Sequence, residues 1–409
     1  MTDLPARLLA GLGSVDRLGL AVSGGGDSMA MLHLAVAAGL RPDVVTVDHG
    51  LRVEAAAEAA MVGQVSAGYG LRHDTLRWQG WDHSGNLQNE ARKARRRLMA
   101  EWALGRGVGA IALAHTQDDV GETFLMRLAR GAGVDGLAAM APVWAEAGVT
   151  WVRPMLAMTR AELRAWLTWQ GLTWAEDPSN ENLAFDRIKV RKALPALGAM
   201  GLTSARLAEV AGHMAEARLA LEQATQAASV QTLSLNANAV CIDPLHLADE
   251  TPEVQRRLIL RVIAHLSPAE YGPRGPAVQA LLARVVAGKP ATLAGCRFVP
   301  DRKRLCFWAF REVKAVADQV CRPDQLWDGW WRITGPAPDG AQVRILGSGI
   351  ALCPDWRAAG VPRAALLASP AVWLHDSLIA APHAGFRAST YSAVPLHPWL
   401  GRNVNTLSH

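Results

Sequence analysis

The chain has 409 residues, half of them hydrophobic and 19% charged, so it is long enough for two or three packed domains and is not expected to be disordered. All five cysteines lie in the second half without a C-x-x-C pair, which gives no zinc site and indicates a reducing compartment. The sequence shows no leader and no apolar run of about 20 residues, so we expect a cytoplasmic protein without a membrane span. The net charge of +5 permits a polyanionic partner.

A glycine-rich loop joins the first predicted strand to the first apolar helix. Residues 18–22 predict a buried strand, and residues 28–35 predict a helix with an apolar face. The glycines between them allow the backbone to approach a ligand closely, and the free N–H groups of a helix start attract phosphate. The lysine of a Walker A loop and the third glycine of a dinucleotide fingerprint are both absent. The remaining pattern resembles the pyrophosphate loop of the N-type ATP pyrophosphatases and predicts ATP binding by Ser23, Gly24, Gly25, Gly26, Asp27 and Ser28.

The aspartate of this loop predicts a cation. Asp27 carries a negative charge inside a loop built to hold phosphates, and the two would repel each other unless a metal ion lay between them. We therefore expect Asp27 to bind Mg²⁺.

Polar residues also follow the second predicted strand. The strand at 44–48 ends in Asp48 and His49, and further strands are predicted at 71–76 and 151–154. Ligands of open parallel sheets bind at the carboxyl ends of the strands. We therefore expect Asp48 and His49 to contact ATP.

The strand predicted at 110–114 leads into a second group of polar residues. His115, Asp118 and Asp119 come first, and Glu122 follows in the next helix. Capping of that helix accounts for one aspartate. A histidine and three carboxylates within eight residues also indicate contact with a metal or with ATP, so we take His115, Asp118 and Asp119 as catalytic candidates.

Arginines gather at three places in the first half of the chain. A run of charge is usually a solvated helix face, but cations beside a nucleotide site also suit phosphate binding, and both interpretations stay open. Arg92 is expected to bind ATP. The candidates for tRNA or phosphate contacts are Arg95, Arg127, Arg130, Arg187 and Arg191.

The order of the predicted elements indicates an α/β protein with three domains. Strands and helices alternate over residues 1–199, which predicts a doubly wound parallel sheet. Residues 200–315 predict a mainly helical domain with one long helix at 204–230 and a hairpin at 291–310. Residues 320–409 predict a small, mostly β module.

Several motifs of the first half occur together and in order. They are the loop at 23–28, the segment 47–52, Gly85-Asn86 with the Ala-Arg-x-x-Arg helix from Ala91, the block 115–137, and Asp177-Pro178-Ser179-Asn180 ahead of Arg187 and Arg191. With these motifs the chain resembles the tRNA(Ile)-lysidine synthetases. It departs from them at Arg96, where the family commonly has an aromatic residue, and at Ile188, where a polar residue is frequent.

The resemblance implies an adenine nucleotide alpha-hydrolase-like PP-loop fold and a two-step reaction. ATP adenylates the C2 oxygen of the wobble cytidine in a tRNA(Ile) with a CAU anticodon and releases pyrophosphate, and the amine of free lysine then displaces AMP to give lysidine. Asp27, with Asp118 or Asp119, would hold Mg²⁺, and we favour Asp27 and Asp118 as the metal ligands. Asp118, Asp119 and Glu122 are all candidates for the base that deprotonates lysine.

Three other functions are alternatives to the lysidine reaction. A tRNA thiolase would share the loop but needs cysteines near it, and this chain has none before Cys241. A glutamine-fed amidation needs a cysteine at position 2, where Thr2 stands. A binding protein without catalysis would not need Asp27, His115 or Asp118. A homodimer stays open.

Arginines are also predicted to guide tRNA across the middle domain. We expect these residues, with those of the first half, to form a track along the tRNA body whose binding weakens steeply with salt. They are Arg256, Arg257, Arg261 and Arg284.

Overall fold

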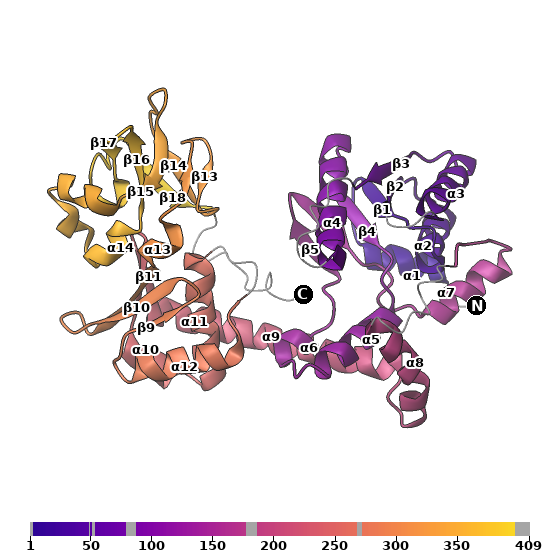
Figure 1. Cartoon of the computed structure of the whole chain (residues 1–409). Coiled ribbons are helices and arrows are strands. Elements are labelled where there is room, and N and C mark those ends of the chain that lie inside the picture. Colours follow the sequence, from indigo (N-terminus) through magenta and orange to yellow (C-terminus); the bar gives the residue numbers. More distant parts are fainter. Residues whose placement is uncertain are drawn as a thin grey trace. The chain divides into compact units, whose positions relative to one another are not determined.

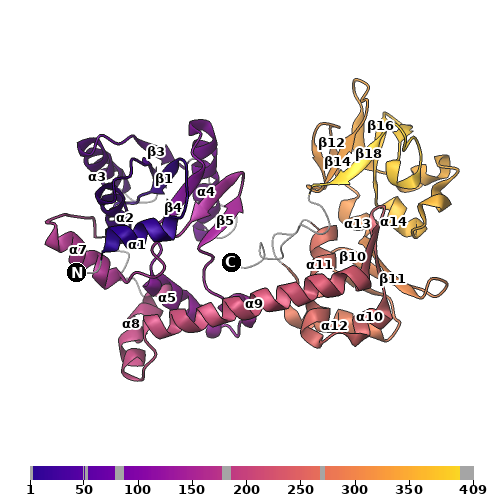
Figure 2. The ribbon, with the colours of Figure 1, turned by 180° about the vertical axis from the view of Figure 1, so that it is seen from behind.

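The computed structural model describes residues 3–48, 50, 54–78, 87–176, 186–267 and 272–396 (Figure 1). The chain divides into two compact units, Met1–Arg218 and Leu219–His409, and the boundary falls inside the long helix α9 (Ser204–Thr232), which Figure 2 shows as one continuous ribbon. The three-domain division stays a prediction.

Unit 1, residues 1–218, contains a six-stranded sheet in the order β3-β2-β1-β4-β6-β5. The first five strands in this order are parallel, and β5 pairs antiparallel with β6 at the edge. This confirms the doubly wound sheet predicted from the sequence. The strands are β1 (Leu18–Ala21), β2 (Asp43–Asp48), β3 (His73–Arg77), β4 (Ala110–Leu113), β5 (Val143–Glu146) and β6 (Val149–Val152).

Helices cover both faces of this sheet because successive strand residues point to opposite sides. Val44 packs with residues of α1, α2 and α7, whereas its neighbour Val45 packs with residues of α4. The helices of unit 1 are α1 (Leu4–Leu12), α2 (Gly26–Ala37), α3 (Glu54–Gly68), α4 (Leu87–Arg106), α5 (Gln117–Leu128), α6 (Val134–Leu137), α7 (Arg160–Trp169) and α8 (Asp186–Ala199), followed by the start of α9.

The sheet reverses its strand order between β1 and β4. From β1 the chain crosses to β2 on one side and later returns to β4 on the other. At such a point the connections leave in opposite directions, so a crevice opens beyond the carboxyl ends of the two strands. The glycine-rich loop follows β1, and the segment from His115 follows β4. The topology therefore places both predicted groups of polar residues at one crevice.

One strand at the sheet edge was missed by the sequence analysis. Instead of a single strand at 151–154, the structure has the hairpin β5–β6. The turn residues Ala147 and Gly148 both have positive φ, 53° and 76°, as a two-residue hairpin turn requires. Alanine rarely adopts this conformation, so the turn lacks the Asn-Gly or Asp-Gly pattern that would have predicted it.

Unit 2, residues 219–409, holds three antiparallel sheets. A five-stranded sheet, β7-β8-β11-β10-β9, packs against α11 and α12, so the middle region carries more strand than predicted. Sheets of four (β12-β15-β16-β17) and three strands (β13-β14-β18) form the C-terminal region and confirm its mostly β character. The elements are α10 (Pro244–Asp249), α11 (Pro252–Leu266), α12 (Gly275–Val286), α13 (Val313–Val316), α14 (Arg363–Leu367), β7 (Leu233–Asn236), β8 (Ala239–Ile242), β9 (Ala291–Leu293), β10 (Cys296–Asp301), β11 (Cys306–Arg311), β12 (Val320–Cys321), β13 (Leu326–Trp327), β14 (Trp331–Thr334), β15 (Gln342–Ile345), β16 (Pro370–Leu374), β17 (Ser377–Ala380) and β18 (Ser392–Pro395).

Two of the four arginines expected on the tRNA track are buried instead. Arg257 and Arg261 are each 5% exposed and form ion pairs with Glu222 of α9. Arg261 also donates to Gln226 and to Ser229. The prediction that these two residues contact tRNA is therefore wrong, because their guanidiniums are buried and paired with Glu222 inside unit 2. Arg256 and Arg284 remain predicted contacts.

In the part of the chain that the structure describes, every helix is too short or too polar to cross a lipid bilayer.

Replacing Arg261 by alanine should destabilise unit 2. Glu222 would lose its closest partner while staying largely buried, and breaking a buried pair on one side costs about 3 kcal/mol or more. Denaturant unfolding measures the loss. Arg322→Ala is the control, because the Arg322–Asp324 pair is exposed and contributes at most about 1 kcal/mol. Equal stability of the two variants would contradict the assignment of Arg261 to the folded core.

Candidate active site

The glycine-rich loop is closed by its two serines. Ser28 Oγ donates to the carbonyl of Gly25 (2.9 Å) and accepts from the backbone N–H of Ser23 (3.1 Å). The residue ahead of α2, Gly25, makes no side-chain cap, so the first N–H groups of that helix point out unpaired by any capping side chain. Gly24 has a φ of +92°, which favours glycine. The loop therefore has the geometry of a phosphate cradle.

A second segment holds the outside of the loop. The N–H of Ala175 donates to the carbonyl of Gly24 (3.0 Å), and the indole of Trp174 lies against Gly26. A Cβ on Gly26 would come within 3.3 Å of that ring, so a side chain there would push the two segments apart. Glycine at position 26 thus allows the loop and the Trp174 segment to pack closely.

Asp27 at the start of α2 forms an ion pair that the sequence did not predict. Arg160 Nε donates to Asp27 Oδ2 (3.1 Å), whereas Oδ1 is buried and accepts no hydrogen bond from any described residue. Burial raises the pKa of Asp27 in spite of the Arg160 charge. The side chain therefore holds one unsatisfied, electron-rich oxygen at the phosphate loop.

Arg160 connects this aspartate to the residues that follow β4. Its Nη2 donates to Asp119 Oδ1 (3.0 Å) and its Nη1 to Glu122 Oε1 (3.2 Å). Its backbone N–H donates to Asp118 Oδ2 (2.7 Å). Burial alone would lower the pKa of Arg160, but the three carboxylates raise it above its usual range. Asp27, Asp118, Asp119 and Glu122 thus form one group, the carboxylate cluster.

Members of the carboxylate cluster differ in how many hydrogen bonds their oxygens accept from the protein. Asp119 accepts from Thr116 N–H (2.7 Å) as a helix cap and from Arg187 (2.8 Å). Glu122 is fully buried and accepts from Arg187 (2.7 Å) and Arg191 (2.8 Å). Burial raises the pKa of Glu122, but the bonds and charges of these arginines outweigh burial and hold it below its usual value. Only Asp118 has an oxygen, Oδ1, that is free of hydrogen bonds to the described residues and is not deeply buried.

Positive charge gathers on the other side of the strand β4. Burial and mutual repulsion lower the pKa of the Arg95 and Arg153 guanidiniums to about 10. Within the described residues, one carboxylate, Glu146, faces this group, and it pairs with Arg96 (3.1 Å). Such an excess of cations fits a polyanion better than it fits the protein alone. The arginine cluster consists of Arg92, Arg95, Arg96, Arg127 and Arg153.

His115 lies beside the arginine cluster. Arg153 Nε donates to His115 Nδ1 (3.2 Å). Burial, followed by the charges of Arg153, Arg187, Arg95 and Arg92, lowers the pKa of His115 well below its usual value. The ring is therefore neutral at physiological pH.

Two other predicted site residues, Asp48 and Arg130, have no described contact with the loop or with either charged cluster. Asp48 accepts from the N–H of Gly50 (2.9 Å), and no described contact joins it to the loop; His49 lies outside the described residues. Arg130 is exposed and pairs with Asp186 (3.0 Å). Asp48, His49 and Arg130 remain predicted ligand contacts.

Arg160 and Arg153 are the residues that sequence analysis missed. Arg160 is the first residue of α7 and lies between the two residues of the capping box, Thr159 and Glu162, so the helix start was predictable but the direction of the Arg160 side chain was not. Arg153 follows β6, whose pairing depended on the unpredicted hairpin.

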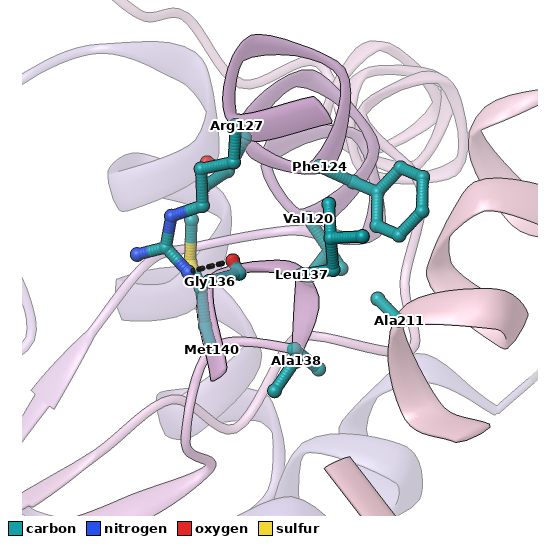
Figure 3. Close-up of a pocket in the computed structure, with 10 residues that line it drawn as sticks. Val120, Phe124, Arg127, Gly136, Leu137, Ala138, Met140 and Ala211 are labelled. Atoms are coloured by element: carbon teal, nitrogen blue, oxygen red, sulfur yellow. Dashed lines mark hydrogen bonds between the residues drawn. The ribbon is translucent and has the colours of Figure 1, made fainter. Parts of the chain in front are cut away.

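A small hollow elsewhere in unit 1 is not the site. Figure 3 shows it between α5, α6 and α9, with Phe124, Leu137 and Ala211 in its wall and Arg127 donating to the carbonyl of Gly136 (2.8 Å). Its enclosed volume is about 0 Å³, too little for even one water molecule, whereas ligand pockets begin at roughly 300 Å³. The open edge beyond β1 and β4 is therefore the better candidate.

Known proteins match this chain over most of its length. Residues 7–197 match a family model described as a PP-loop domain. The chain is 47% identical over 374 residues to a tRNA(Ile)-lysidine synthase of Ruegeria pomeroyi, covering 90% of this chain and 89% of that protein. It is 39% identical over 300 residues to a tRNA(Ile)-lysidine synthase of a Bradyrhizobium species, covering 69% of this chain and 84% of that protein. Among solved structures, a U34-tRNA thiolase of Methanococcus maripaludis has a TM-score of 0.45 and 16% identity, covering 52% of this chain and 78% of that one.

Replacing Asp27 by asparagine should stabilise unit 1 without ligand. Because the folded-state pKa of Asp27 is raised, the ionised group costs stability above that pKa, and asparagine removes the cost while still accepting from Arg160. We expect an unfolding temperature at least about 2 °C higher at neutral pH. The difference should shrink as the pH falls and vanish below about pH 3, where the aspartate is protonated in both states. A lower unfolding temperature for Asp27→Asn at neutral pH would contradict this account.

Proposed function

The chain belongs to the tRNA(Ile)-lysidine synthase family, and from this premise we propose that it adenylates the wobble cytidine of a tRNA(Ile) with a CAU anticodon and then joins free lysine to C2, releasing AMP. The observation that carries this proposal is the meeting, at one crevice, of a phosphate cradle, a carboxylate cluster and an arginine cluster. The cradle binds the phosphates of ATP, the carboxylate cluster suits Mg²⁺ and the lysine amine, and the arginine cluster suits the phosphates of ATP and tRNA.

The first step requires the α-phosphate to be held in line with the cytidine C2 oxygen. The N–H groups at the start of α2 hold the phosphates, and the serine hydroxyls keep the cradle in shape. Negative charge builds on the departing pyrophosphate as the bond to the α-phosphate breaks. Arg92 and other members of the arginine cluster lie within electrostatic reach of each other and stabilise that charge.

Mg²⁺ fits this site as a phosphate-bound ion. Within the described ranges, no three His, Cys, Asp or Glu residues form a metal-binding group, so a cage made of protein alone is not available. Mg²⁺ commonly keeps waters and uses one or two carboxylates together with phosphates. Asp27 Oδ1, buried and without a partner among the described residues, fits one such ligand, with Asp118 as the second. A bound ion would withdraw charge from the phosphates.

The second step requires lysine to lose a proton before its amine attacks. Asp119 and Glu122 are occupied by arginines and cannot take up a proton without breaking those pairs. Asp118 keeps Oδ1 free of protein partners among the described residues and is the member of the carboxylate cluster best suited to act as base. Because one carboxylate oxygen cannot hold Mg²⁺ and a proton together, Asp118 would be a ligand of Mg²⁺ only while it carries no proton from lysine.

A tRNA thiolase is the alternative, and the structure gives it no support. All five cysteines belong to unit 2, whereas the phosphate cradle and both charged clusters belong to unit 1. Sulfur transfer needs a thiolate or a cluster-binding cysteine beside the activated base. The lysine reaction needs only carboxylates and cations there. A homodimer and a cytoplasmic location remain predictions.

Labelled lysine should enter tRNA(Ile) only when position 34 is cytidine, and one AMP should form for each lysine incorporated. The test is incubation with ATP, Mg²⁺, lysine and unmodified tRNA, followed by nucleoside analysis. Asp27→Asn should reduce incorporation by about 100-fold or more, the cost of losing one charge-stabilising group. Incorporation of sulfur by the purified protein, or lysine entry into a tRNA with uridine at position 34, would overturn the proposal.

Arg130→Gln should weaken tRNA binding and flatten its dependence on salt. If Arg130 contacts one phosphate, the log–log slope falls by roughly 0.7 to 0.9, while ATP affinity stays unchanged. The matched control is Arg206→Gln, since Arg206 is equally exposed and paired with Glu209 but lies outside the predicted contacts. The same titration tests Arg256 and Arg284. An unaltered slope for Arg130→Gln would show that its charge is spent on Asp186 and solvent.

A further inference from the structure

Three contacts fix the side chain of Arg153 after β6. Its Nε donates to His115 Nδ1 (3.2 Å), and its Nη1 donates to the carbonyl of Ala141 (2.7 Å). Its guanidinium lies 4.0 Å from the centre of the Trp144 ring, a cation–π contact. A planar guanidinium held at two edges and one face cannot turn away from His115.

The platform beneath Arg153 is itself held in place. Trp144 stacks on Trp151 across the β5–β6 hairpin, with ring centres 5.9 Å apart and an interplanar angle of 16°. Trp144 Nε1 donates to Glu146 (3.1 Å), which also accepts from Arg96. The β5–β6 hairpin therefore supplies a fixed aromatic surface against which Arg153 packs.

The Arg153 contact determines which nitrogen of His115 carries the proton. An arginine N–H only donates, so His115 Nδ1 must accept and must be unprotonated. The charged groups that face the ring are Arg153, Arg187, Arg95 and Arg92, all of them positive, which excludes the imidazolium form. The single ring proton therefore lies on Nε2, for which the described residues offer no hydrogen-bond partner.

We propose that Arg153 is a positioning residue that locks His115 in the Nε2–H tautomer, so that the neutral imidazole donates a hydrogen bond to a phosphate oxygen of the substrate and does not act as a base. This inference rests on the proposed function for the identity of the acceptor. A base would need its lone pair on Nε2 and its proton on Nδ1, where it would meet the N–H of Arg153. The histidine thus belongs with the groups that stabilise charge in adenylation.

The first test uses the protein without substrates. In ¹⁵N NMR of histidine-labelled protein, the ring signals that disappear in His115→Gln should show a protonated Nε2 and an unprotonated Nδ1. In Arg153→Lys, which keeps the charge but loses the planar fork, the His115 signals should shift toward a mixture of tautomers. Arg17→Lys, at the amino end of β1 and far from the ring in sequence and sheet position, is the control. Detection of a protonated Nδ1 in the wild-type protein overturns the inference, whatever the enzyme makes.

The second test separates a donor from a base. The amide nitrogen of glutamine reaches the place of Nε2, so His115→Gln should keep at least about a tenth of the adenylation kcat, whereas His115→Asn, which reaches only the place of Nδ1, should lose about 100-fold. Arg153→Lys should lower kcat about tenfold with little change in the KM for ATP. Equal loss in His115→Gln and His115→Asn would show that Nε2 acts as a base and would contradict the inference. If NMR shows the Nε2–H tautomer but the wild-type protein does not adenylate tRNA, the proposed function is rejected and the assignment of the tautomer stands.

Discussion

The guanidinium of Arg160 is shared by carboxylates from two different helices, and this interaction joins the two halves of the site. Asp27 comes from the first turn of α2, after β1, and Asp119 and Glu122 come from α5, after β4. Without a cation between them, three carboxylates so close together would repel each other and could not stay ionised. The shape of the crevice in the ligand-free protein therefore depends on one side chain at the start of α7.

Charge is divided unevenly between the two clusters that flank the crevice. The carboxylates are neutralised by Arg160, Arg187 and Arg191, whereas the arginine cluster has Glu146 as its single carboxylate within the described residues. Repulsion within the arginine cluster costs folding free energy, and binding of a polyanion relieves this repulsion. The buried, ionised Asp27, whose pKa is raised, adds a similar cost at the phosphate loop. Stability is thus given up where ATP and tRNA are expected to bind.

Sequence patterns predicted the parts of this site that depend on the local chain. Glycines before an apolar helix, and acids directly after a buried strand, identified the loop and all four carboxylates as candidates, because parallel strands end at a common edge. They did not identify Arg160 or Arg153, since the partners of these residues lie far away in sequence: Arg160 and Asp27 are 133 positions apart. The same limit explains Arg257 and Arg261, whose helix looked charged and exposed until the long helix α9 was seen to bring Glu222 against it.

A double-mutant cycle between Asp27 and Arg160 tests most directly whether one ion pair unites the site. The free energy of unfolding of unit 1 would be measured for the wild-type protein, Asp27→Asn, Arg160→Gln and the double variant. If the pair couples the two halves, removing the Asp27 charge stabilises the Arg160→Gln protein more than it stabilises the wild type, with a coupling energy of about 1–3 kcal/mol. Additivity to within about 0.3 kcal/mol would show that the two residues act independently and would contradict the account.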